Sequence, residues 1–91
     1  MEIISNMAET ESIRVQLDYP LERVTQPIIY HLVTDYHLIP NIRRANIDSH
    51  AGGMMVLQIE GTRADLEAGM DYLRRLGITV TEVGLEQPWA V

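Results

Sequence analysis

The 91-residue sequence contains no cysteine, which excludes a disulfide, a thiolate zinc site, an iron–sulfur cluster and a cysteine nucleophile. Basic residues are also few: seven lysines and arginines stand against 13 acids, for a formal net charge of −6. That balance argues against a general nucleic-acid binder, because duplex binding relies on cationic side chains that neutralise phosphates. No apolar run approaches the roughly 20 residues of a membrane span, and residues 1–10 do not resemble a signal peptide. We therefore expect a cytoplasmic protein.

Alternating apolar and polar residues predict four strands, at residues 12–18, 41–48, 54–60 and 78–83. The second strand alternates imperfectly. Either it begins after Arg43, or a β-bulge resets its register there. Before the third strand, Gly52 and Gly53 supply residues that can take a positive φ in a hairpin loop.

Two stretches carry the apolar period of an amphipathic helix. The first is predicted to begin between residues 22 and 25, with Pro27 in its first turn, and to end near residues 36–37. The second follows Thr62, which with an aspartate three positions later has the spacing of a capping box. It stops before Gly77, which we expect in the left-handed conformation that ends many helices.

The order β-α-β-β-α-β leaves few compact arrangements, because both helices must cover one face of one sheet and crossovers are right-handed. We predict an α+β fold, the ferredoxin-like βαββαβ sandwich, with a four-stranded antiparallel sheet and two helices on one face. The domain spans residues 12–84, between flexible tails at residues 1–11 and 85–91. Met54 and Val56 lie on the uncovered face. A bare apolar face with two free edges predicts a homodimer or a larger homo-oligomer.

Catalytic constellations are absent from the sequence. The three histidines are spaced by six and 13 residues, whereas two ligands on one helix face need three or four. Gly52-Gly53 leads into a strand, although phosphate loops lead into a helix. Glu67 and Asp71 lie one helical turn apart, but arginines follow them, so solvated ion pairs are the simpler interpretation. We expect no enzymatic activity, no metal and no cofactor.

Asn41 opens the second strand and is a candidate for ligand contact, because an amide both donates and accepts hydrogen bonds, as recognition of an amino acid requires. Arg43 and Arg44 follow and can hold a carboxylate in a charge-assisted pair. Structural roles stay open for these residues, since asparagine beside proline is common in turns and charged edge strands resist aggregation.

Several segments spread over roughly residues 13–84 carry a family resemblance. They are Pro40-Asn41-Ile42, Ala45-Asn46-Ile47-Asp48, Ala51-Gly52-Gly53, Glu60-Gly61, Gln26-Pro27-Ile28-Ile29, Ala68-Gly69-Met70-Asp71-Tyr72-Leu73 and Val80-Thr81-Glu82-Val83-Gly84. By these segments the chain resembles the NIL domain. That domain is a ferredoxin-like module, similar in architecture to ACT domains, and is found at the C-terminus of the ATPase subunit of bacterial methionine importers.

In those importers the domain pairs with its twin and binds methionine, which inhibits transport. The resemblance implies a regulatory sensor module that binds a small amino acid, first of all methionine or a related sulfur amino acid, at or near a homodimer interface. It places the ligand along the second strand, with Asn41 and the main chain near Ile47 at the zwitterion. Ile42, Ile47 and Met55 would then surround the thioether. Arg43 and Arg44 make this strand more basic than the family pattern, which bears on ligand preference.

Other interpretations remain beside this one. The sequence has no Walker lysine motif, so we expect a transporter or enzyme partner to be supplied in trans. The chief alternative is a protein–protein interaction adaptor without a small-molecule ligand, whose apolar sheet face docks another protein. A ferredoxin-like fold by itself does not discriminate between these functions.

Overall fold

A computed structural model describes residues 9–20, 27–48 and 52–84. The elements follow one another in the predicted order, which is confirmed. They are β1 (Glu11–Tyr19), α2 (Ile28–Thr34), β2 (Ile39–Asp48), β3 (Gly52–Gly61), α3 (Arg63–Arg75) and β4 (Thr79–Val83). Most of the two predicted tails, at residues 1–11 and 85–91, lies outside the described ranges.

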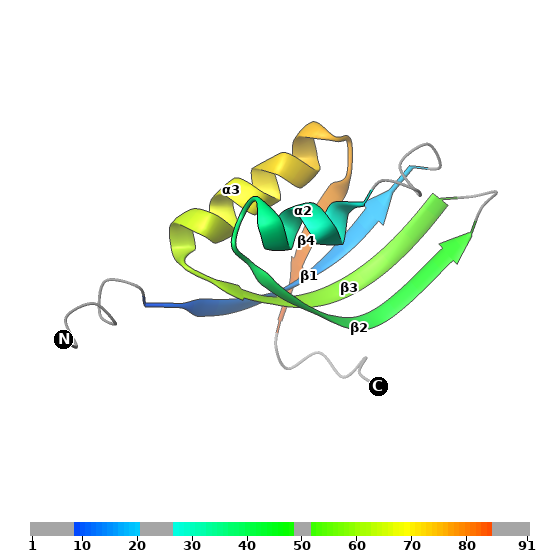
Figure 1. The fold of residues 1–91 in the computed structure, drawn as a ribbon. Coiled ribbons are helices and arrows are strands. Elements are labelled where there is room, and N and C mark those ends of the chain that lie inside the picture. Colours follow the sequence, from blue (N-terminus) through cyan, green and yellow to red (C-terminus); the bar gives the residue numbers. More distant parts are fainter. Residues whose placement is uncertain (1–8, 21–26, 49–51, 85–91) are drawn as a thin grey trace.

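The four strands form one antiparallel sheet in the order β2-β3-β1-β4, and both helices cover the same face (Figure 1). This is the α+β, ferredoxin-like arrangement that the sequence predicts. β1 and β3 are central and pair over all nine residues of β1. The two outer strands, β2 and β4, are therefore the edges of the sheet.

The core lies between the sheet and the two helices. Val15 on β1 faces Leu57 on β3, and Leu17 faces Met55, so one parity of each central strand points toward the helices. The side chains with the least exposure are Val15, Leu17, Leu32, Leu38, Leu57, Ile59 and Leu73. Alternation along β1 and β3 thus separates a buried face from an open one, as period-2 patterning requires.

Helix α3 begins and ends as its sequence predicts. The Thr62 hydroxyl oxygen accepts a hydrogen bond from the Asp65 amide at 3.1 Å, which caps the first turn. At the other end Gly77 has φ +85°. Its amide donates to Arg74 O at 2.9 Å and the Ile78 amide donates to Leu73 O at 3.1 Å, the paired bonds of a Schellman motif.

Helix α2 is shorter than predicted. Its expected start, residues 22–25, lies outside the described residues, and Pro27 stands immediately before the first helical residue instead of within the first turn. Its end near residues 36–37 is wrong, because α2 stops at Thr34. His37 takes the left-handed φ of 58°, and the Leu38 amide donates to Leu32 O at 3.0 Å. This turn brings Leu38 into the core and ends the helix early.

The sheet face without helices is more polar than predicted. Met54 and Val56 lie on it, but a hydrogen-bonded row crosses the central strands beside them, so the expectation of a bare apolar face is wrong. Arg14 donates to Gln58 Oε1 at 2.8 Å, and Gln58 Nε2 donates to Ser12 Oγ at 3.2 Å. Gln58 lies on β3 itself, and its partners Arg14 and Ser12 come from β1, through a register that sequence alternation cannot show.

Candidate functional site

Strand β2 carries most of the predicted ligand contacts. It pairs with β3 on one side only, and every residue from Asn41 to Asp48 is exposed. Its exposed apolar side chains include Ile42 and Ile47, at 51% and 47% exposure. A long edge strand with apolar side chains and free main-chain groups is a surface suited to a ligand or to a second strand.

A β-bulge at Arg43 determines which face of the sheet each following side chain of β2 lies on. Ile42 pairs with Leu57 and Arg44 pairs with Val56, so Arg43 has no opposite residue and the register shifts there. Of the two interpretations open from sequence, the bulge is confirmed, because the strand begins before Arg43. The extra residue lets Ile42 share the helix-side face with Ile47, which an uninterrupted alternation would have prevented.

The predicted site residues do not gather around one cavity. Asn41 is opposite Gln58 and lies on the open face, whereas Ile42 and Ile47 point to the helix side. Met55 is only 6% exposed and packs in the core beneath Ala45, its partner on β2. A ligand can therefore contact all three residues only along the outer edge of β2. There it would meet Asn41 on one face of the strand and Ile42 and Ile47 on the other.

Asn41 lies beside polar groups that are already bonded to one another. It lines a shallow concavity of about 240 Å³ together with Ser12, Gln58 and Glu60. Gln58 is held by Arg14 and Ser12, and the Glu60 carboxylate accepts from the Thr10 hydroxyl at 3.5 Å. No described residue is hydrogen-bonded to the side-chain amide of Asn41. Its donor and acceptor are thus available within an ordered polar surface.

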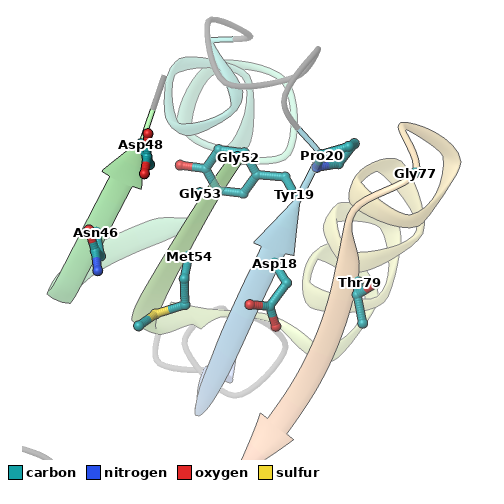
Figure 2. A pocket seen from close by; sticks show the side chains of 10 residues that line it. All are labelled: Asp18, Tyr19, Pro20, Asn46, Asp48, Gly52, Gly53, Met54, Gly77 and Thr79. Carbon is teal, nitrogen blue, oxygen red and sulfur yellow. The ribbon is translucent and has the colours of Figure 1, made fainter. Parts of the chain in front are cut away.

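A larger concavity than the one beside Asn41 lies at one end of the sheet, with a volume of about 590 Å³ (Figure 2). A row of open-face residues lines it, one from each strand in sheet order: Asn46, Met54, Asp18 and Thr79. The Asp18 carboxylate accepts a hydrogen bond from Gln16 Nε2 at 3.0 Å. Sequence reasoning missed this row because three inter-strand registers define it and no local motif marks it.

Glycines shape the same end of the sheet. Gly52 has φ +100°, as predicted for the hairpin, whereas Gly53 is required for close packing: a Cβ there would lie 2.9 Å from Tyr19 Cε2. Burial of Tyr19 at this contact raises the pKa of its hydroxyl. The predicted loop residues 49–51 lie outside the described residues.

A chain of aromatic rings covers the surface of the two helices. Ring centroids are 5.2 Å apart for Tyr30 and His31, 6.0 Å for His31 and Tyr72, and 5.1 Å for Tyr72 and Tyr36. His31 Nδ1 lies 2.8 Å from an Asp35 carboxylate oxygen, and this hydrogen bond lowers the pKa of Asp35. Burial raises the pKa of the Tyr72 hydroxyl.

Metal and membrane chemistry find no support in the described ranges. Within residues 9–20, 27–48 and 52–84, no three histidine, cysteine, aspartate or glutamate side chains gather closely enough to hold a metal ion. Neither of the two helices described there is long and apolar enough to cross a lipid bilayer.

Comparison with known proteins places this geometry in a family. The sequence pattern of the NIL domain matches residues 13–82. Two curated relatives, each called "Methionine import ATP-binding protein MetN", come from Cupriavidus metallidurans and Cupriavidus pinatubonensis. Each is 32% identical to the chain over 71 residues, a match that covers 75% of this chain and 21% of the relative. The chain thus spans about a fifth of the length of these relatives.

A solved structure shares the fold. It is the crystal structure of the C-terminal domain of an ABC transporter ATP-binding protein from Enterococcus faecalis. The two chains superpose with a TM-score of 0.72 at 26% sequence identity, and the match covers 93% of this chain and 97% of that one.

Proposed function

The chain belongs to the NIL domain family, and from this premise we propose that it is a non-catalytic sensor module that binds methionine or a related sulfur amino acid at the β2 edge. The curated relatives named for methionine import support this choice of ligand class. The likeness to the C-terminal domain of a transporter's ATP-binding protein supports a regulatory role. The cytoplasmic location predicted from sequence belongs to the same proposal.

The observation that carries the proposal is the free outer edge of β2 with Asn41 near its beginning. An amino acid lying along this edge would place its ammonium and carboxylate against the Asn41 amide and free main-chain groups. Arg43, exposed at the bulge, supplies a guanidinium that can pair with the carboxylate. The thioether side chain would lie against Ile42 or Ile47 on the helix side, while Met55 supports the strand from the core.

A second copy of the chain completes the proposed site. Ile39, Ile42 and Ile47 are 64%, 51% and 47% exposed, which is unusual for three isoleucines on one strand. Pairing of this edge with the same edge of a twin would bury them and enclose a ligand between two copies. The homodimer and the site at its interface are thus one proposal.

Isothermal titration calorimetry tests both the identity of the ligand and its proposed binding site at the β2 edge. We expect heat of binding with methionine or homocysteine, and at least a tenfold weaker affinity for Asn41→Ala, because a buried ligand charge would lose its partner. Asn46→Ala is the matched control, since it removes the same amide from the same strand and the same face but at the far end. Absence of heat with sulfur amino acids, or equal losses from both variants, would contradict the assignment.

A protein-interaction adaptor without a small ligand is the second candidate. The same three exposed isoleucines favour it, because an apolar edge strand can pair with a partner protein as readily as with a twin. A transporter or enzyme acting in trans is the partner that the family premise suggests. Binding of such a partner that is indifferent to added methionine would favour this candidate over the sensor.

A further inference from the structure

A groove runs along the opposite side of the molecule, between the first residues of β1, the end of β4 and helix α3. Its volume is about 350 Å³. Ile13, Leu66 and Met70 form its apolar part, and charged side chains line the rest. This volume lies in the range of natural ligand sites and accommodates one or two side chains of an incoming segment.

The groove exists because β4 is shorter than its neighbour. β1 pairs with β3 from Glu11 to Tyr19, but with β4 only from Arg14 to Asp18 (Figure 1). In the part of the chain that the structure describes, Glu11, Ser12 and Ile13 have no strand on that side. Their outward main-chain groups have no strand partner among the described residues, and a further strand could pair with them below the first turns of α3.

Charge in the groove is unbalanced toward the acidic side. Arg63 pairs with Glu11 at 3.2 Å, and Arg74 pairs with Asp71 at 3.5 Å, so each lining arginine already has a carboxylate. The remaining lining acids, Glu67 and Glu82, have no ion-pair partner among the described residues. They stand on two sides of the apolar part, one on α3 and one on β4.

We propose that this groove binds an extended basic segment of another protein, which adds a strand to the free edge of β1. Alternate side chains of such a strand point toward α3, so an apolar one would contact Ile13, Leu66 and Met70. A lysine or arginine two positions away, on the same face of the segment, would then meet Glu67 or Glu82. This interaction surface is independent of the amino-acid site on β2.

The charge of the chain argues for an occupant from outside. Residues 1–8 and 85–91 contain no lysine or arginine, so neither end of this chain can supply the required cations. A second copy carries the same net charge of −6, which disfavours its approach to an acidic groove. A partner with a basic extended segment is the complementary chemistry.

Fluorescence anisotropy with a labelled seven-residue peptide tests this directly. The probe alternates apolar and threonine residues and has lysine or arginine two positions from its central apolar residue. We expect saturable binding to the full chain that weakens as salt increases, because exposed charge pairs are screened. Glu67→Gln and Glu82→Gln should each weaken binding about threefold to tenfold. Asp48→Asn, an exposed acid at the end of the opposite edge strand β2, should leave it unchanged.

Main-chain chemistry separates strand addition from simple charge attraction. Methylation of the peptide nitrogens that face β1 should abolish binding, whereas methylation of the alternate nitrogens should preserve it. Equal binding of a peptide with glutamate in place of its basic residues would overturn the inference. So would equal tolerance of both methylated peptides.

Other occupants would show themselves in the same experiment. Peptide binding that appears only in a Trp89→Ala variant would identify the chain's own C-terminal segment as the occupant. A change in sedimentation mass on Glu67→Gln would identify a second copy. Either result would overturn the external partner, and neither depends on whether methionine binds to β2.

Discussion

The two edge strands of the sheet differ in length, exposure and charge. β2 has ten residues, pairs with β3 over its whole length and exposes isoleucines on a bulged strand. β4 has five residues, pairs with β1 only from Arg14 to Asp18 and borders an acidic groove. One edge is therefore complete and exposes isoleucines beside two arginines, and the other is incomplete and borders a groove with acidic side chains.

This difference separates two kinds of recognition within one small sheet. The bulge and Arg43 on β2 limit pairing to partners that match its irregular register, a common way to protect an edge from aggregation. At β4 the shortness of the strand creates a place for a segment, and the carboxylates around it select for positive charge. The two proposed interfaces can therefore be changed one at a time.

The largest expected effect is a loss of folding stability, which would affect both edges of the sheet together. Leu57 is fully buried on β3, the strand that holds β2 in the sheet. Leu57→Ala should lower the free energy of unfolding by about 2–4 kcal/mol through lost burial and a cavity. Asn41→Ala, on the exposed edge, should lower it by less than about 0.5 kcal/mol. Urea denaturation of both variants measures this, and equal losses would mean that the β2 edge is part of the core.

Two glycines, one near each edge strand, should differ in how an alanine substitution lowers stability. A Cβ at Gly61 would lie 2.5 Å from Leu38 Cδ2, in the turn that leads into β2. Gly61→Ala should therefore cost about 1–3 kcal/mol by overpacking. Gly77, before β4, has open space around it but φ +85°. Gly77→Ala should cost about 1–2 kcal/mol through backbone strain alone. Thermal unfolding of the pair compares them, and a neutral Gly61→Ala would show that Leu38 can move.

Introducing a charge on each edge strand in turn tests which edge forms the homodimer interface. If the homodimer forms through β2, Ile47→Lys should raise its dissociation constant at least about tenfold, because an apolar contact would be replaced by a charge. Thr81→Lys, an exposed position on β4, should leave the dimer intact. Sedimentation velocity over a concentration series reads both. Dissociation by Thr81→Lys alone would assign the homodimer to the other edge.

The smallest effect is confined to alkaline pH. Burial raises the pKa of Tyr19 above its ordinary value of 10.0, so the unfolded chain loses this proton first. Stability from this group is complete below pH 10.0 and declines as pH rises through the raised pKa of the folded state. Tyr19→Phe should reduce that decline, while the raised pKa of Tyr72 leaves a part of it in place. Tyr30→Phe, whose ring is 62% exposed, is the control in urea denaturation at pH 9 to 11. Identical profiles for the wild type and Tyr19→Phe would contradict this account.

The sequence alone determined the order of elements and the ends of α3. These features follow from contacts between residues close in the chain: alternation along each strand, the Thr62 cap and the left-handed Gly77. The end of α2 escaped prediction because His37, not a glycine, takes the left-handed conformation there.

Only the tertiary structure decided how the candidate sites are composed. The bulge at Arg43 places Ile47 on the same face of β2 as Ile42, opposite to Asn41. The groove beside β4 arises because β4 ends at Val83, opposite Arg14, while β1 begins three residues before Arg14, at Glu11. Both depend on register between strands far apart in sequence. Side-chain alternation tells which residues share a strand face, but the hydrogen-bonded partner across the sheet sets which strands bring those faces together.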